Sequence, residues 1–530
     1  MMKKAIKKLL AALLAVAMVC AMAIPAFAYD TKEDLNTKHE YDAFQIFNGD
    51  VTGNDTDGFK ISNVTWGKNI PHPEDFLEKL TEDSTIGGEF KTDFTPQEAV
   101  AVISKWHDSD NNSIAFARFV CNYIYTDSNA NREPVIQGGH TGGFELPMAG
   151  YYLIVDTSPF SGGDSYHAYN SFLLKVNQKN YHVQITPKVV KPTVKKEVYD
   201  NDDGSSSGDN NGWGSSADHA INEEFKFRLI AKLPESENNG HAYDYYDKYS
   251  VIFHDTLSDG ITYDRPDSVV IKSNGKTYVI PNDSSKYTIG LESQNCLVVK
   301  IPDVKACAKD AGFDLNDGAT ITVTYTAHLN ENAAVNGSAE NKNSVRLQYS
   351  NNPRPDDEYW GYTPNYTPES EVYVYTYQLN NTKYHDEVNE NNKLEGAGFR
   401  LYSDEACNNE IKLKKNNDGT YSRDFSTGAS GVEMISDNKG QFNVKGLDAG
   451  TYYLRETKTP DGYSACADKK IVISATHDGN HVSLSGNLST TIINKKDGGI
   501  TLPSTGGIGT TIFYVVGGGL MVAAIVLLVT

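Results

Sequence analysis

Short runs in which apolar and polar residues alternate recur along most of the chain, with turn-forming residues between them. Such alternation predicts strands with one buried face. The clearest runs are Val194–Val198, Phe225–Leu233, Tyr249–His254, Leu297–Ile301, Thr320–His328, Ser344–Tyr349, Glu371–Leu379, Gly398–Tyr402, Thr451–Glu456, Lys470–Ser474 and Thr490–Asn494. Short strands at this spacing are typical of β-sandwich modules. The pattern therefore predicts a mainly β chain of tandem immunoglobulin-like sandwich domains.

One stretch near the N-terminus departs from this alternation. Apolar residues from Pro96 to Ile124 recur at helical spacing, and Thr95 stands where an N-cap is expected. The run Phe144–Asp156 is again strand-like. We therefore expect an N-terminal domain that combines strands with some helix.

Both ends of the chain carry patterns of a different kind. Residues 1–28 have a lysine-rich start, an apolar run and a terminal Ala-Phe-Ala, which predicts a secretory signal peptide. Near the other end, Leu502-Pro-Ser-Thr-Gly506 precedes Ile512–Val529, an uncharged apolar run barely long enough to span a bilayer. The two patterns together predict an exported chain that a C-terminal segment retains at the membrane.

Length and charge narrow the function classes. The 530 residues suffice for several domains, and the composition, with 39% hydrophobic residues, allows packed cores. Lys+Arg is 48 against 69 Asp+Glu, a formal net charge of -21, which argues against nucleic-acid binding. The expected division is a signal peptide (1–28), an N-terminal domain (29–188), a middle sandwich (189–370), a C-terminal sandwich (371–497) and a terminal signal (498–530).

The stretch Tyr452-x-Leu454-x-Glu456 carries the strongest candidate chemistry. Alternation places Glu456 on the same strand face as two apolar side chains, and a carboxyl buried there has a raised pKa unless it is paired. A protonated carboxyl beside a neutral buried lysine could polarise an asparagine carbonyl and shuttle protons while the amine attacks. The product is a Lys–Asn isopeptide bond, with ammonia released.

The twelve residues from Tyr452 to Tyr463 resemble the E-box of Gram-positive pilins and of collagen-adhesin B-type (Cna-B) domains. The preceding Leu394–Tyr402 stretch is similar to another segment of those domains. The resemblance implies that Lys383 is the nucleophile, Asn494 the acceptor and Glu456 the catalytic acid/base of an autocatalytic isopeptide bond. The same resemblance implies a disulfide between Cys407 and Cys466.

The middle block resembles the isopeptide-forming middle domain of the same pilins. Its matching stretches begin at Pro192, Phe253 and Asn343. The resemblance implies a bond between Lys196 and Asn343, with Asp255 as the buried carboxyl. The neighbouring alternatives stay open: Lys195 for the lysine, Asn341 for the asparagine, and Glu223 or Glu224 for the acid.

Two further residues are implicated in linkage between subunits. The Leu502–Gly506 stretch resembles a sortase sorting signal, which implies Thr505 as the acyl donor. Val183–Lys188 resembles the pilin motif, with Thr186 in place of the usual tyrosine, which implies Lys188 as the acceptor amine. Lys191 is the nearest alternative for the linking lysine.

These resemblances imply the major subunit of a sortase-assembled, wall-linked pilus used in adhesion. The implied partners are sortases, identical subunits, minor pilins, peptidoglycan, and host or bacterial surface ligands. A wall-anchored adhesin or ancillary pilin that is never polymerised is the alternative.

No motif of a hydrolase occurs in the sequence, so no enzyme and no cofactor are expected. Without a CxxC or a histidine cluster, no zinc site is expected, and Cys296 and Cys307 are close enough in sequence to pair.

Overall fold

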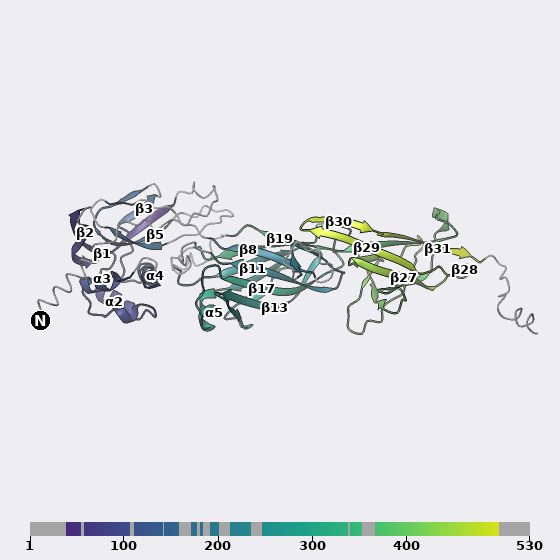
Figure 1. Ribbon diagram of the computed structural model, residues 1–530, viewed down its shortest axis with the longest axis horizontal. Helices are drawn as coiled ribbons and strands as arrows, with labels where there is room; N and C mark the ends of the chain where they lie inside the picture. Colours follow the sequence, from purple (N-terminus) through teal and green to yellow (C-terminus); the bar gives the residue numbers. More distant parts are fainter. Residues whose placement is uncertain are drawn as a thin grey trace, which may run out of the picture.

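Three structural units follow one another along the long axis of the molecule (Figure 1). The computed structural model describes residues 39–54, 58–106, 111–140, 143–157, 171–176, 181–183, 191–200, 212–234, 246–337, 340–351 and 366–497. Helices concentrate in the first unit, and the other two consist almost entirely of sheets. The predicted mainly β architecture, with some helix in the N-terminal domain, is confirmed.

The N-terminal domain packs helices against one twisted sheet. The sheet has the order β2 (Gly58–Trp66), β1 (Glu40–Asn54), β5 (Gly150–Asp156) and β6 (Ser171–Val176), with β3 (Ile136–His140) also paired to β1, and β4 (Phe144–Leu146) pairs with β7 (Tyr181–Val183). The helical segments are α2 (Pro73–Thr81), η2 (Gly87–Glu89), α3 (Pro96–Ile103) and α4 (Asn111–Thr126). Phe76 and Phe116 of the helices share a core with Phe44 and Leu153 of the sheet.

Helix α3 begins where the sequence predicts. Thr95 accepts a hydrogen bond from the backbone N–H of Glu98, whose carboxylate accepts one from the Thr95 N–H, which completes a capping box. The helix ends at Ile103, and α4 begins at Asn111. The stretch of helical spacing from Pro96 to Ile124 thus forms two helices.

The middle domain is a sandwich of two six-stranded sheets. One sheet has the order β10 (Ser216–Asp218), β19 (Ser370–Tyr375), β18 (Lys342–Tyr349), β12 (Val251–Leu257), β16 (Cys296–Ile301) and β15 (Thr288–Ser293). The other has the order β14 (Lys276–Val279), β13 (Ile261–Ser273), β17 (Thr320–Leu329), β11 (Glu224–Lys232), β8 (Thr193–Tyr199) and β9 (Trp213–Gly214). The short helix α5 (Val304–Asp310) follows β16. Phe227 of one sheet and Phe253 and Leu347 of the other belong to one continuous core.

The C-terminal domain is a second, smaller sandwich. Its first sheet has the order β23 (Leu413–Lys415), β24 (Tyr421–Arg423), β26 (Val444–Leu447), β20 (Tyr377–His385), β31 (Ser489–Lys496) and β28 (Tyr463–Ser464). Its second has the order β22 (Glu410–Ile411), β21 (Gly398–Tyr402), β27 (Gly450–Lys458), β29 (Lys469–Asp478) and β30 (His481–Gly486), with β25 (Met434–Ile435) paired to β21 and the 3-10 turn η4 (Glu390–Asn392) ahead of it. The first and last long strands, β20 and β31, run parallel to one another, with Lys383 opposite Ile492.

The boundary between the two sandwiches lies later than the predicted position between residues 370 and 371. The run Glu371–Leu379 is not one strand of the C-terminal domain, because β19 pairs with β18 of the middle domain and β20 pairs with β31. Thr376 alone separates β19 from β20. Residues 374–377 are all buried, and the run contains no glycine, proline or other turn-forming residue, so the sequence pattern does not mark the boundary.

Several predicted features fall outside the described residues. These are the signal peptide (1–28), Lys188, the Leu502–Gly506 stretch with Thr505, and the apolar run Ile512–Val529. Within the ranges that the structure describes, no helix is both long enough and apolar enough to cross a membrane.

Candidate functional sites

The middle domain buries a lysine, an aspartate and an asparagine from facing sheets. Lys196 lies on β8, paired with Leu229 of β11, whereas Asp255 lies on β12 and Asn343 on β18 of the other sheet. Asn343 is opposite Leu257, so Asp255 and Asn343 project from the same face of that sheet. All three residues are almost entirely excluded from solvent.

A tyrosine hydroxyl connects these three side chains. The Lys196 ammonium group contacts Asp255 Oδ1 directly. The Tyr325 hydroxyl donates to Asp255 Oδ2 at 2.6 Å, and it accepts hydrogen bonds from Asn343 Nδ2 at 2.7 Å and from Lys196 Nζ at 3.2 Å. Asn343 Oδ1 is buried and makes no hydrogen bond. The sequence analysis missed Tyr325, because it is one of several large residues at inward positions of an alternating run and nothing local marks it.

Burial shifts the titration of all three ionisable groups toward neutrality. Loss of solvation lowers the pKa of Lys196 to about 8, opposed by the neighbouring Asp255. Burial also raises the pKa of Asp255 and raises that of Tyr325 well above 10, so the phenol keeps its proton. An amine with a lowered pKa is available as a neutral nucleophile, and a carboxyl with a raised pKa can carry a proton.

The alternatives left open for this site occupy other environments. Lys195 is exposed and its Nζ lies 2.6 Å from a carboxylate oxygen of Glu197. Asn341 is buried, but its amide is used to hold backbone groups of a nearby turn and of β19. Glu223 accepts from the Ala220 backbone, and Glu224 forms an exposed bidentate pair with an arginine. The structure therefore brings together Lys196, Asp255 and Asn343, and the four alternative residues lie outside this cluster.

The C-terminal domain contains a second cluster with a different layout. Lys383 on β20 contacts Asn494 Oδ1 on the adjacent parallel strand β31. Asn494 Nδ2 donates to Glu456 Oε1 at 2.7 Å, and the same carboxylate oxygen lies 4.0 Å from Lys383 Nζ. The second oxygen of Glu456 accepts from the Cys466 backbone N–H at 2.9 Å. The lysine and the asparagine thus come from one sheet, and the acid reaches them from β27 of the other.

The predicted burial of Glu456 is confirmed. Tyr452 and Leu454 are buried on the same face of β27, and the side chains of Glu456 and Lys383 are both 0% exposed. Burial lowers the pKa of Lys383, with the charge of Glu456 acting in the opposite direction. The amine that touches the asparagine carbonyl is therefore biased toward its neutral form.

The cysteines implied as a disulfide are both free thiols in the structure. Cys407 Sγ lies 3.8 Å from Asp468 Oδ2, a carboxylate that Arg455 also binds at 2.6 Å. Burial raises the pKa of the Cys466 thiol to about 11. The expected bridge is therefore not formed in the structure, where the Cys407 thiol contacts the Asp468 carboxylate. Cys296 and Cys307 are free as well.

The N-terminal domain also has a buried acid on a strand, but its partner is a histidine and not a lysine. Asp156, at the end of β5, is buried and shares a 2.6 Å hydrogen bond with His39 Nδ1. Strand β1, which pairs with β5, has no lysine in its sequence. This pairing differs from the lysine-containing clusters of the two sandwiches.

Comparison with known families identifies both sandwich domains. Residues 234–353 match the model of the Gram-positive pilin backbone subunit 2, Cna-B-like domain. Residues 378–488 match the SpaA prealbumin-like fold domain. The resemblance to Gram-positive backbone pilins is confirmed over these two stretches. The search of curated proteins found no significant match to this sequence.

The solved structures that this chain resembles include three pilins. The 35 kDa C-terminal fragment of the major pilin GBS80 of Streptococcus agalactiae is 24% identical, with a TM-score of 0.40, over 57% of this chain and 99% of that chain. The T6 backbone pilin of Streptococcus pyogenes is 17% identical, with a TM-score of 0.46, over 87% of this chain and 96% of that chain. The major pilin SpaD of Corynebacterium diphtheriae is 17% identical, with a TM-score of 0.38, over 70% and 83% respectively.

Proposed function

We propose that this protein, in which a Gram-positive pilin backbone domain is followed by a SpaA prealbumin-like domain, is the major structural subunit of a covalently polymerised, wall-anchored pilus that mediates adhesion. Backbone pilins are structural proteins and not enzymes. The observation that carries the proposal is that each sandwich holds a buried lysine, a buried acid and a buried asparagine in one cluster, joined directly in the C-terminal domain and through the Tyr325 hydroxyl in the middle domain. Such a cluster serves chemistry that the protein performs once, on itself.

In the C-terminal domain, the proposed reaction joins Lys383 to Asn494. The neutral amine attacks the side-chain carbonyl carbon of the asparagine, and Glu456 accepts the proton that the amine loses. Glu456 then returns a proton to Asn494 Nδ2, with which it already shares a 2.7 Å hydrogen bond. The bond from the carbonyl carbon to Nδ2 breaks, ammonia leaves, and a secondary amide remains.

In the middle domain, the same reaction would join Lys196 to Asn343. Asp255 takes the role of the acid/base, and the Tyr325 hydroxyl lies between it and the asparagine amide nitrogen. Tyr325 is therefore placed to relay a proton from Asp255 to the departing nitrogen. This bond would connect the two sheets of the sandwich, whereas the C-terminal bond would connect neighbouring strands of one sheet.

Both bonds would act as cross-links that reduction cannot open. Each closes a long loop, which restricts the unfolded chain and so stabilises the folded domain. A shaft subunit that carries tension between neighbours benefits from this, because the load passes through covalent bonds. The buried clusters and the elongated row of domains support the same role (Figure 1).

The proposed assembly step uses Lys188, which precedes the two sandwich domains in the sequence, and Thr505, which follows them. A sortase would cleave after Thr505 and form a thioester with its carbonyl, and the amine of Lys188 in the next subunit would displace the enzyme. Repetition gives an open head-to-tail polymer of identical subunits. Export by the signal peptide, minor pilins, final attachment to peptidoglycan and contact with host or bacterial surface ligands complete the proposed setting.

The deciding experiment is denaturing electrophoresis of cell wall released by a muralytic enzyme, probed with antibody to this chain. We expect a ladder of covalent multimers that collapses to monomer in Lys188→Ala. Lys191→Ala is the matched control and should keep the ladder. A single monomer band from the wild type would instead indicate a wall-anchored adhesin or ancillary pilin, and an unchanged ladder in Lys188→Ala would exclude Lys188 as the linking amine.

A further inference from the structure

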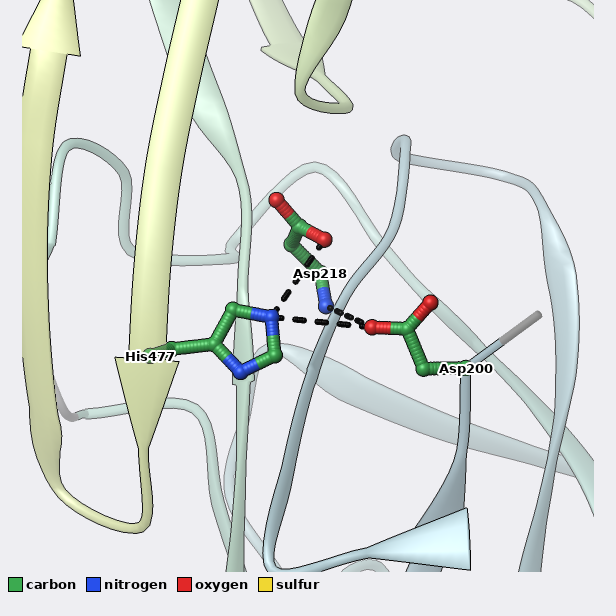
Figure 2. Close-up of side chains that lie close together, drawn as sticks. All are labelled: Asp200, Asp218 and His477. Carbon is green, nitrogen blue, oxygen red and sulfur yellow. Dashed lines mark hydrogen bonds and ion pairs between the residues drawn. The ribbon is translucent and has the colours of Figure 1, made fainter. Parts of the chain in front are cut away.

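Two aspartates and a histidine meet where the middle and C-terminal domains join. Asp200 directly follows β8, Asp218 ends β10, and His477 lies on β29 of the C-terminal domain. Their side chains are at most 2% exposed. Figure 2 shows the imidazole and the two carboxylates directed at one point, with the histidine contributed by a different domain from the aspartates.

The distances within this group are those of ligands that share an ion. His477 Nε2 lies 3.6 Å from Asp200 Oδ2 and 3.5 Å from Asp218 Oδ1. These separations are longer than hydrogen bonds of ordinary length. Ligand atoms about 2.0–2.2 Å from a tetrahedral zinc ion lie roughly 3.4 Å from each other. The three ligand atoms therefore need little rearrangement to surround one ion.

Asp218 supplies an independent observation. Both oxygens of its carboxylate are buried, and neither makes a hydrogen bond. Burial of an ionised carboxylate without hydrogen bonds is costly, and such groups in proteins are paired or coordinate metals. The carboxylate of Asp218 is aimed at the point where Asp200 and His477 converge (Figure 2).

The second nitrogen of the imidazole is also held. Ser216 Oγ lies 2.9 Å from His477 Nδ1. When the serine oxygen accepts this hydrogen bond, Nδ1 carries the proton and the lone pair of Nε2 faces the carboxylates. Metal-binding histidines are oriented in this way by a partner on their other nitrogen. Nearby, the Tyr375 hydroxyl donates to the Gly479 carbonyl at 2.9 Å, which fixes the turn after β29.

We propose that Asp200, Asp218 and His477 bind one Zn²⁺ ion that fastens the C-terminal domain to the middle domain. Two carboxylates and a neutral imidazole balance the charge of a divalent cation, and a water molecule completes the tetrahedron. A nitrogen ligand and a set of three protein ligands suit Zn²⁺ better than Ca²⁺, which takes six to eight oxygens. The site is independent of the proposed function, since it needs neither polymerisation nor the isopeptide bonds.

This proposal replaces the sequence-based expectation of no zinc site. That expectation rested on the absence of a CxxC or a histidine cluster. The three ligands come from separate segments that meet only because the two domains dock. No local motif is therefore available to reveal them.

Untagged protein covering residues 29–497, stripped with a chelator and dialysed, tests the proposal by calorimetric titration with ZnCl2. We expect one Zn²⁺ per chain, and Co²⁺ in its place should give the visible absorption of a tetrahedral site. Asp218→Asn, which keeps the side-chain shape, and His477→Ala should each weaken binding by more than about 100-fold. Ser216→Ala, which removes only the orienting partner, should weaken it by about 10–100-fold. His481→Ala, an exposed histidine on the adjacent strand β30, is the matched control and should bind as the wild type does.

Hydrogen exchange tests whether bound Zn²⁺ holds the two domains together, which the binding affinity does not show. Zn²⁺ should slow exchange in both β10 and β29, and circular dichroism should show that each variant remains folded. Absence of Zn²⁺ binding by the wild type would overturn the site and leave the group as a histidine packed between two carboxylates. Zn²⁺ binding that is unchanged in Asp218→Asn and His477→Ala would overturn it equally, as would a preference for Ca²⁺ over Zn²⁺.

Discussion

Replacing Glu456 with glutamine should leave the C-terminal domain folded and without its Lys383–Asn494 bond. Glutamine has nearly the shape of glutamate, and its carbonyl oxygen can still accept a hydrogen bond from Asn494 Nδ2, as Glu456 Oε1 does now. It cannot take up the proton of the attacking amine. The substitution therefore removes the acid/base and retains most of the packing around Lys383, which stays fully buried.

The loss of this bond should lower the stability of the domain by an amount that is readily measured. Lys383 and Asn494 are separated by 111 positions. Closure of a loop of that length lowers the entropy of the unfolded chain enough to stabilise the domain by about 5 kcal/mol. For a domain of roughly 120 residues, whose unfolding entropy is about 0.25 kcal/mol/K, this corresponds to a Tm lower by about 20 °C.

Intact-mass spectrometry and calorimetry of residues 29–497 provide the assay. The wild type should weigh two ammonia molecules less than its sequence mass, and Glu456→Gln only one. Glu405→Gln, an exposed carboxylate of the same domain, should match the wild type in both measurements. If Glu456→Gln still loses two ammonia molecules, Glu456 is not the catalytic group. If it loses one and the Tm falls by only a few degrees, the loop-closure argument is wrong.

Three further outcomes follow from particular contacts. In Glu456→Gln the amine of Lys383 stays free, and burial holds its pKa in the folded protein below the ordinary 10.5. Between the folded-state pKa and 10.5, the unfolded chain therefore binds more protons than the folded chain does. The free energy of unfolding from urea titrations should therefore rise with pH in that window, whereas the cross-linked wild type should show no such rise; a flat profile in the variant would contradict the lowered pKa. Tyr325→Phe removes the hydroxyl that contacts Lys196 and Asn343, so the mass loss of ammonia from the middle domain should be slow and time-dependent; complete loss in freshly purified protein would rule out the relay. Thr95→Ala removes the cap of α3 and should lower the stability of the N-terminal domain by about 1 kcal/mol in urea unfolding, with no change in the ladder of multimers.

The sequence predicted those parts of the fold that local patterns determine. Alternation located the long strands, the run around Glu456 indicated a buried carboxyl, and Thr95 marked the start of α3. The resemblance to backbone pilins, confirmed over residues 234–353 and 378–488, named the two lysines and two asparagines that the structure brings into the two buried clusters.

Features that depend on tertiary packing could not be predicted in this way. Tyr325 is one inward aromatic among many until strands from both sheets are assembled around it. The boundary at Thr376 lies inside a run of four buried residues without a turn-forming residue, because one strand continues almost directly into the next domain. Asp200, Asp218 and His477 approach each other only when two domains dock. Each of these positions is determined by contacts between segments distant in sequence.

The parallel pairing of β20 with β31 has a consequence for the reach of an assembled fibre. With the Lys383–Asn494 bond closed, the 111 positions between those residues cannot contribute to extension, whatever happens to the strands inside the loop. At about 3.4 Å per residue, roughly 380 Å of contour length is withheld from each subunit in this domain alone. A fibre of such subunits would keep nearly constant length in strong flow, and the distance between a cell and its attachment point would be set by the number of subunits.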